Sequence, residues 1–237
     1  MNREGDRAGL IPDGLRVVGA RSADACFDQA DRFAVGSRLG TAQLGIYSFA
    51  YQHTLMALRR LGAVAETVAL PVFSRLQDDE PALARAYCAL TRVWALVVLV
   101  AAALLFHLAG PLVSWLYPDR WAEAVPGIRA LCVAMAAAGL NSHPGLVWIA
   151  RGRMRLKLWW SVANLGTMAV ILAVGITHGI EGVAYALAAR SLLATVVAQG
   201  ITRRVAGVRN RDYLRALWPG VALGAALALA LIRLLGP

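Results

Sequence analysis

The stretch VWALVVLVAAALLFHLAGPLV, residues 93–113, decides the fold class of this chain. It holds one histidine and no formally charged side chain. As a helix it is long enough to cross a hydrocarbon core of about 30 Å. An open strand could not satisfy its backbone polar groups in lipid. The stretch therefore predicts a transmembrane helix.

Apolar segments of the same kind continue toward the C-terminus, at residues 126–149, 158–177, 180–202 and 214–235. Two weaker segments precede residue 93, at 22–38 and 43–73, and both carry charged residues. Residues 43–73 exceed one straight span at 1.5 Å per residue, so we expect a tilted, broken or partly cytosolic helix. The fold class predicted is all-α, a polytopic integral membrane helical bundle of about six or seven transmembrane helices. We expect residues 1–21 to form a cytoplasmic N-terminal segment and residues 22–237 a single transmembrane domain.

The overall composition agrees with a membrane protein. Hydrophobic residues make up 59%, charged residues 16%, and the mean hydropathy is +0.57. Ordinary soluble domains are about a quarter charged, so soluble and disordered classes are disfavoured. The net charge of +10 could suggest nucleic acid as a partner. The basic residues lie between apolar segments rather than on one patterned face, so we expect no nucleic-acid partner.

The distribution of basic residues predicts the topology. Sixteen lie in residues 1–21 and in the loops 74–92, 151–157 and 203–215, against three in the alternate loops and at the C-terminal end. Cytoplasmic loops are enriched in Lys and Arg. The asymmetry predicts seven crossings, with a cytoplasmic N-terminus and an external C-terminus.

Enzyme signatures are absent from the sequence. It contains no HExxH, GxSxG or P-loop motif, and its four histidines and three cysteines lack metal-ligand spacing. The acidic run Asp78, Asp79 and Glu80 precedes Pro81, which favours a helix N-terminus over a catalytic metal site. We therefore expect no enzymatic activity, catalytic residue, metal or cofactor.

Polar residues inside the apolar segments are the candidates for substrate binding. They are Arg59, Arg60, Asn141, Asn164 and Arg190. A charge at the bilayer centre is costly, so such residues usually face a watery cavity or a counter-ion. For the arginine pair, an ion pair with Glu66, an early exit of the helix from the membrane and an anion-binding cavity remain equal alternatives. For Arg190 an ion pair is favoured over a binding role.

Two further features have both a functional and a structural interpretation. Residues 141–144 (Asn-Ser-His-Pro) form a polar break in an apolar helix, which is typical of transport sites and equally of packing kinks. Asp24, Asp28 and Asp31 share one helical face and are candidates for coupling to a proton or sodium ion. Solvated acids at the cytoplasmic helix end are the favoured interpretation of these three.

Several motifs together resemble a known family. They are DRFAVGSRLG (31–40), LGIYSFAY (44–51), LPVFSRLQDD (70–79), ARGR (150–153) and GIEGVAYA (179–186), with Trp121 between the third and the fourth. In this order and spacing they resemble the bacterial polysaccharide and lipid-linked oligosaccharide flippases of the multidrug/oligosaccharidyl-lipid/polysaccharide flippase superfamily. The resemblance covers roughly residues 23–202.

The resemblance implies a two-lobed bundle around a central cavity, of which this chain corresponds to the C-terminal half. It implies movement of a polyprenyl-pyrophosphate-linked oligosaccharide across the bacterial cytoplasmic (inner) membrane, with membrane lipid and a missing N-terminal half or a second copy as partners. Asp31 fits a commonly acidic position of the family, whereas Arg59 and Arg60 match no motif of it. Two alternatives stay open: a small-molecule or drug exporter of the same architecture, and a non-transporting remnant or assembly subunit.

Overall fold

The computed structural model describes the backbone of residues 3–235 and, within that range, every side chain except those of 3–17, 20, 21, 23, 27, 28 and 235. All regular secondary structure in the described residues is helical, as the sequence predicted. The α-helices are α1 (Arg3–His53), α2 (Leu55–Arg75), α3 (Glu80–Leu116), α4 (Val125–Leu140), α5 (Pro144–Ala150), α6 (Met154–Gly175), α7 (Gly179–Ala206) and α8 (Asn210–Leu235). Short 3₁₀ turns, η1 (Asp119–Ala124) and η2 (Ile176–His178), precede α4 and α7.

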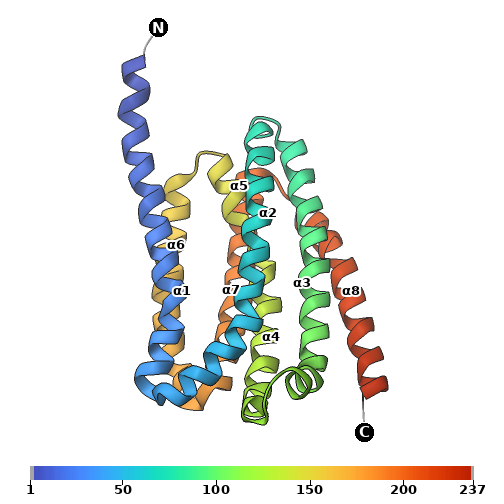
Figure 1. Ribbon diagram of the computed structural model, residues 1–237. Helices are drawn as coiled ribbons and strands as arrows, with labels where there is room; N and C mark the ends of the chain where they lie inside the picture. The colour runs from blue at the N-terminus through green and yellow to red at the C-terminus, as the bar shows by residue number, and fades with distance from the viewer. Residues whose placement is uncertain (1–2, 236–237) are drawn as a thin grey trace.

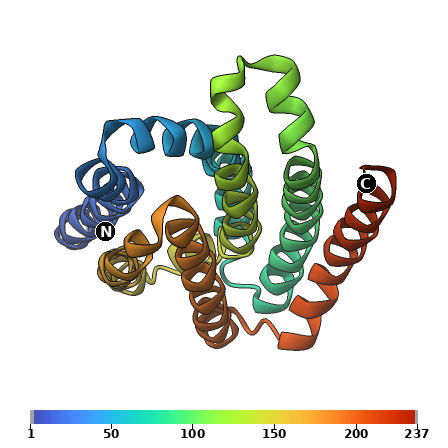
Figure 2. The ribbon, with the colours of Figure 1, turned by 90° about the horizontal axis from the view of Figure 1, so that it is seen from below.

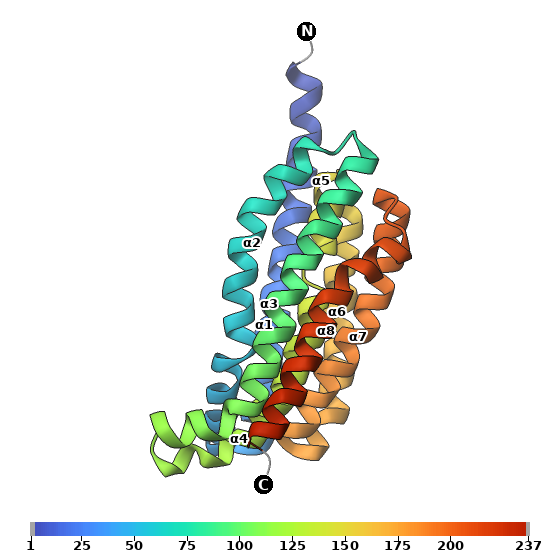
Figure 3. The same ribbon diagram turned by 90° about the vertical axis from the view of Figure 1, so that its right-hand side faces the viewer.

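The long helices run alternately up and down, and the two termini lie at opposite ends of the bundle (Figure 1). Helix α8 packs on α3, α7 on α4, and α6 on both α1 and α7. Seen from below, α1 and α6 lie on one side and α8 on the other, with α3 and α4 between them (Figure 2). The beginning of α1 projects beyond the rest of the bundle (Figures 1 and 3). Helix α1 is continuous through residue 22, so the boundary predicted between residues 1–21 and 22–237 does not coincide with a helix end.

Four described stretches are long and apolar enough to cross a membrane: Glu80–Leu116, Asp119–Ala150, Met154–Ala206 and Asn210–Leu234. The third folds back at η2 and contains both α6 and α7. The five strong segments of the sequence thus fall within these stretches, except that the last segment ends one residue later, at residue 235. Helices α1 and α2, which contain the two weaker segments, are not among them. The count of six or seven spans is not confirmed and stays a prediction.

The predicted break within residues 43–73 lies at Thr54, between α1 and α2. A second break, not expected, lies at Gly40, whose φ of 86° and ψ of 173° interrupt α1. Only glycine adopts this backbone conformation without steric cost. Residues 41–53 consequently turn away from the first part of α1 and run across the lower end of the molecule (Figure 2). The acidic run before α3 caps that helix as expected, since Asp79 Oδ1 accepts the Ala82 N–H at 2.9 Å.

Two glycines bring α8 close to α3. A Cβ added at Gly220 would lie 2.7 Å from the backbone carbon of Ala95, and one at Gly224 would lie 3.4 Å from the Leu99 side chain. Small residues four positions apart allow such close approach between helices in a membrane. The C-terminal helix therefore packs backbone to backbone against α3, the helix that contains the apolar stretch 93–113.

The basic loops gather at one end of the bundle. The connections α2–α3, α5–α6 and α7–α8 all lie at the end where the chain begins, whereas η1 and η2 lie at the other end (Figure 1). These three connections fall within the basic loops that the sequence singled out. The alternation that the positive-inside pattern requires is therefore present in the fold.

Candidate functional site

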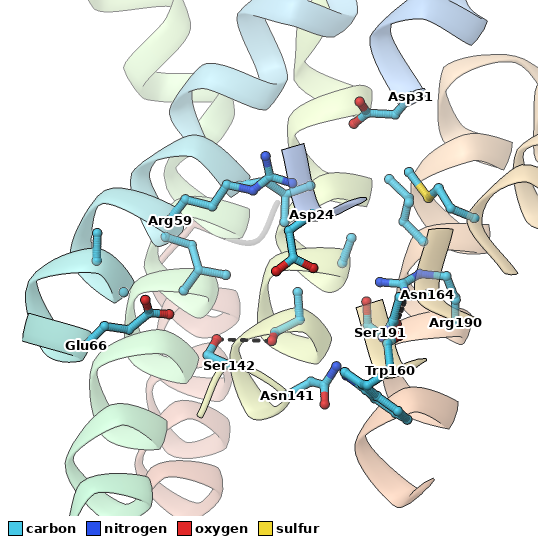
Figure 4. Close-up of a pocket in the computed structure, with 18 of the residues that line it drawn as sticks. Asp24, Asp31, Arg59, Glu66, Asn141, Ser142, Trp160, Asn164, Arg190 and Ser191 are labelled. Atoms are coloured by element: carbon cyan, nitrogen blue, oxygen red, sulfur yellow. Dashed lines mark hydrogen bonds between the residues drawn. The ribbon is translucent and has the colours of Figure 1, made fainter. Parts of the chain in front are cut away.

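A cavity of about 400 Å³ lies between α1, α2, α4, α6 and α7 (Figure 4). Its wall combines apolar side chains with ten polar or charged ones: Asp24, Asp31, Arg59, Glu66, Asn141, Ser142, Lys157, Asn164, Arg190 and Ser191. Six of these residues were predicted from the sequence as site candidates. We call this space the central cavity.

The α1 wall is built around a buried carboxylate. Asp31 is 2% exposed, and its Oδ2 accepts a hydrogen bond of 2.7 Å from the Tyr47 hydroxyl. The neighbouring Arg32 guanidinium lies 4.4 Å from the ring centroid of Tyr51, which is fully buried. Asp31 is thus not a solvated acid at a helix end, contrary to the favoured interpretation. The side chain of Asp28, the third predicted acid, lies outside the described residues.

The α2 wall separates the two adjacent arginines. Arg59 lines the central cavity, and its guanidinium lies 5.4 Å from the Tyr51 ring centroid. Arg60 is exposed and is not part of the lining. One helical step rotates a side chain by about 100°, so neighbours cannot share a face. Glu66 stands two turns after Arg59 and also points into the cavity (Figure 4).

Asp24 holds an ion pair at the cavity wall. Lys157 Nζ donates to Asp24 Oδ2 at 2.8 Å and to Ser161 Oγ at 3.0 Å. The pair links α1 to α6 and is partly exposed, with 22% of the Lys157 and 45% of the Asp24 side chain accessible. A structural ion pair therefore accounts for Asp24 at least as well as coupling to an ion does.

Arg190 and Asn164 meet across the opposite wall. Arg190 on α7 is 8% exposed, and its Nη1 donates to Asn164 Oδ1 on α6 at 2.6 Å. Asn164 Nδ2 in turn donates to the Trp160 carbonyl at 2.8 Å. Asn164 thus forms a hydrogen bond across helices, from α6 to α7. This network fixes a guanidinium at the cavity surface.

The polar break opens the cavity between α4 and α5. Helix α4 ends at Leu140 and α5 begins at Pro144, as the sequence predicted, and Asn141 and Ser142 line the cavity. Asn141 Oδ1 is buried without a hydrogen-bond partner among the described residues. The indole of Trp94 donates to the Gly139 carbonyl at 3.0 Å. The same carbonyl accepts the backbone N–H of Ser142 at 3.2 Å, so Trp94 adds a second donor at the end of α4.

The described lining combines three carboxylates (Asp24, Asp31, Glu66) with three cations (Arg59, Lys157, Arg190). A balanced set of charges inside a largely apolar bundle suits a ligand that carries both an anionic group and neutral hydrogen-bonding groups. Among the described residues, no group of three His, Cys, Asp or Glu side chains could hold a metal ion.

Four polar lining residues (Glu66, Ser142, Lys157 and Ser191) and the supporting Tyr47 were not singled out as site candidates. Lys157 is the only lysine of the chain and was counted as a loop charge, although its rarity was a signal. Glu66 was considered only as a partner of the arginines. Tyr47 lies in the quoted LGIYSFAY motif, but its contact with Asp31 depends on the turn at Gly40.

Comparison with known proteins supports the resemblance. Residues 10–126 match the family described as polysaccharide biosynthesis protein. The teichuronic acid biosynthesis protein TuaB of Bacillus subtilis is 23% identical over 208 residues, which cover 84% of this chain and 43% of that protein. The amylovoran biosynthesis protein AmsL of Erwinia amylovora is 26% identical over 208 residues, which cover 85% of this chain and 53% of that protein.

The chain spans about half the length of the curated relatives it matches. No solved structure matches it. The apolar helices and the relatives together indicate a multi-pass membrane protein. Residues 10–126 are thus similar to the family described as polysaccharide biosynthesis protein, which agrees with the resemblance found in the sequence.

Proposed function

We propose that this protein moves a polyprenyl-pyrophosphate-linked oligosaccharide across the bacterial cytoplasmic membrane, for export of a polysaccharide. The observation that carries the proposal is the central cavity, in which charged groups from four helices (α1, α2, α6 and α7) face one space inside the bundle. Intramembrane charges that line a cavity mark substrate or ion pathways in membrane proteins. The relatives' names supply the substrate class, since teichuronic acid and amylovoran are polysaccharides.

Within this proposal the two cavity arginines hold the pyrophosphate. Arg59 and Arg190 approach the cavity from α2 and α7, on opposite sides (Figure 4). A guanidinium presents a planar fork of donors that matches phosphate oxygens. Asn141, Asn164 and Ser191 supply neutral groups able to bond sugar hydroxyls. The protein acts as a carrier in this scheme, with no catalytic step assigned to it.

The transport pathway also needs a second lobe. A pathway that opens alternately to the two sides of a membrane is commonly formed between two repeats or halves. We assign the second lobe to an N-terminal half or to a second copy of this chain. In this scheme, the helices described here supply one lobe, and the central cavity is the part of the pathway that this lobe lines.

The adjacent arginines provide a matched test. Arg59→Gln and Arg190→Gln are each introduced at the native locus, with Arg60→Gln as the control. A charge-assisted hydrogen bond contributes about 1.5–3 kcal/mol, so we expect each cavity variant to lower surface polysaccharide about tenfold or more. The lipid-linked precursor should accumulate inside the cell, and immunoblots of membranes should show unchanged protein levels. Arg60→Gln should export as the unmodified protein does.

Three results would contradict the proposal. Normal export by both cavity variants would remove the arginines from substrate binding. Equal loss in Arg60→Gln would indicate a general effect of charge removal. Normal polysaccharide combined with altered drug sensitivity would favour a small-molecule exporter.

A further inference from the structure

A second hollow lies at the basic end of the bundle, away from the central cavity. It has a volume of about 820 Å³ and lies between the first turns of α3, the first turns of α8 and the turn that joins α7 to α8. Helices α3 and α8 lie side by side here (Figure 3). It shares no lining residue with the central cavity. We call it the arginine groove, after the lining residues Arg85, Arg92, Arg209 and Arg215.

The arginine groove carries an excess of positive charge. Two acids, Glu80 and Asp212, complete its charged lining. Asp212 accepts from Arg209 Nε at 3.1 Å, so that pair is neutral as a unit. Among the described residues, no ion pair joins the other three arginines to a carboxylate. Three guanidinium groups against one remaining acid leave the groove suited to an anion.

The fold fixes where these arginines stand. Arg85 and Arg92 are seven positions apart on α3, which places them on one face and about 10 Å apart along the axis. Gly207, with a φ of 62°, turns the chain between α7 and α8. A Cβ at Gly207 would lie 2.6 Å from Glu80 Oε1, so the turn presses directly against the start of α3. Glu80 and Gly207 both line the groove.

The groove lies where both helices change from charged to apolar surface. On α3, Arg92 is followed by exposed Val93 and Val97. On α8, Arg215 is followed by exposed Trp218 and Val221. An exposed tryptophan beside such a change is typical of the headgroup level of a bilayer. A molecule seated in the groove would therefore have its polar part among the arginines and its apolar part against the valines.

We propose that the arginine groove binds the phosphate headgroup of an anionic phospholipid from the surrounding membrane. Guanidinium groups bind phosphate oxygens in a bidentate manner, and basic pockets between transmembrane helices on the cytoplasmic side bind anionic headgroups. The same end of the bundle carries the basic loops that predict a cytoplasmic location. The bound lipid lies outside the central cavity and is a component of the membrane, not the transported substrate.

The test uses the full chain purified in detergent and native mass spectrometry with phosphatidylglycerol, cardiolipin or phosphatidylcholine. The variant is Arg85→Gln/Arg92→Gln/Arg215→Gln. The matched control is Arg203→Gln/Arg204→Gln/Arg211→Gln, which removes three exposed arginines from the same end without touching the groove lining. At about 1 kcal/mol per basic residue near the surface, we expect the groove variant to lose at least tenfold in affinity for the anionic lipids. The control should retain that affinity.

The outcomes separate the proposal from its alternatives. Equal affinity for phosphatidylcholine, or equal loss in the control, would overturn it. Stronger binding of undecaprenyl phosphate than of phosphatidylglycerol, lost in the groove variant, would assign the groove to the transported lipid and would also overturn it.

Cys88 allows a test that leaves every arginine in place. It lines the groove and is half-buried, whereas Cys132 is buried. In a Cys26→Ser background, which removes the exposed cysteine, a maleimide should label Cys88 more slowly in phosphatidylglycerol nanodiscs than in phosphatidylcholine nanodiscs. Equal labelling rates would contradict the proposal even if the arginine variants do not fold.

Discussion

Tyr47 donates a 2.7 Å hydrogen bond to Oδ2 of Asp31, although the two residues lie sixteen positions apart on α1. On a straight helix they would be about 24 Å apart along the axis. The reversal at Gly40 brings them together. The position of the Asp31 carboxylate in the central cavity therefore depends on Gly40, nine residues further along the chain. A Cβ added at Gly40 would have no neighbouring atom within 4 Å.

Gly40→Ala should destabilise the protein through its backbone alone. A side chain at φ 86° and ψ 173° is strained, and the cost is about 1–3 kcal/mol. The control is Gly45→Ala, since Gly45 is helical and has equal open space around it. Thermal unfolding of the purified chain in detergent should show a lower Tm for Gly40→Ala and an unchanged or higher one for Gly45→Ala. Equal Tm values would show that the kink is not required.

Tyr47→Phe should also lower stability, because it removes the hydroxyl that satisfies a buried carboxylate. Hydrogen bonds to charged groups contribute about 1.5–3 kcal/mol. Tyr185→Phe is the matched control, since Tyr185 is exposed. The free energy of unfolding, from denaturant titration in detergent, should fall for Tyr47→Phe alone. A similar small effect in both variants would mean that Asp31 finds another donor.

Much of the fold could be predicted because the membrane limits the choices. Apolar runs of sufficient length must be helical, and the break at residues 141–144 followed from proline chemistry. The cost of placing charged or polar groups inside apolar segments identified Arg59, Arg190, Asn141 and Asn164, which the fold gathers around one cavity. These inferences needed only the position of each residue along a helix.

Features that depend on rotation or on approach between helices could not be predicted. Arg59 and Arg60 look equivalent in sequence, and only the packing of α2 decides which one faces the cavity. Lys157 follows a loop but reaches back to Asp24 on α1. The turn at Gly40 depends on a single torsion angle, and one glycine among 22 gives no signal of it.

Gly220→Ala should separate α8 from α3. The added Cβ would lie 2.7 Å from the backbone carbon of Ala95, and backbone cannot move aside as a flexible side chain does. Overpacking of this kind costs about 1–3 kcal/mol. Gly200→Ala, where nothing lies near the added Cβ, should leave the Tm unchanged or raised. Limited proteolysis should cleave α8 faster in Gly220→Ala, and equal cleavage would argue against close packing.

Asp24 and Lys157 should be energetically coupled. The pair is partly exposed, so the coupling energy should be at most about 1 kcal/mol. A double-mutant cycle with Asp24→Asn and Lys157→Gln measures it through the free energy of unfolding. The double variant should lose less stability than the two single variants together. Additive losses would show that the 2.8 Å contact contributes nothing, and would return Asp24 to the candidates for ion coupling.

The topology itself predicts which loops an impermeant thiol reagent reaches in intact cells. In a background with Cys26, Cys88 and Cys132 replaced by serine, we introduce Gln77→Cys, Arg153→Cys and Arg209→Cys at the basic end. Asp119→Cys and Thr177→Cys probe the opposite end, where η1 and η2 lie. Because basic loops stay in the cytoplasm, only the last two cysteines should be labelled from outside. Labelling at residue 77 from outside would contradict this topology. It would mean that α1 and α2 do not cross the membrane in alternate directions, and that the predicted seven crossings are wrong.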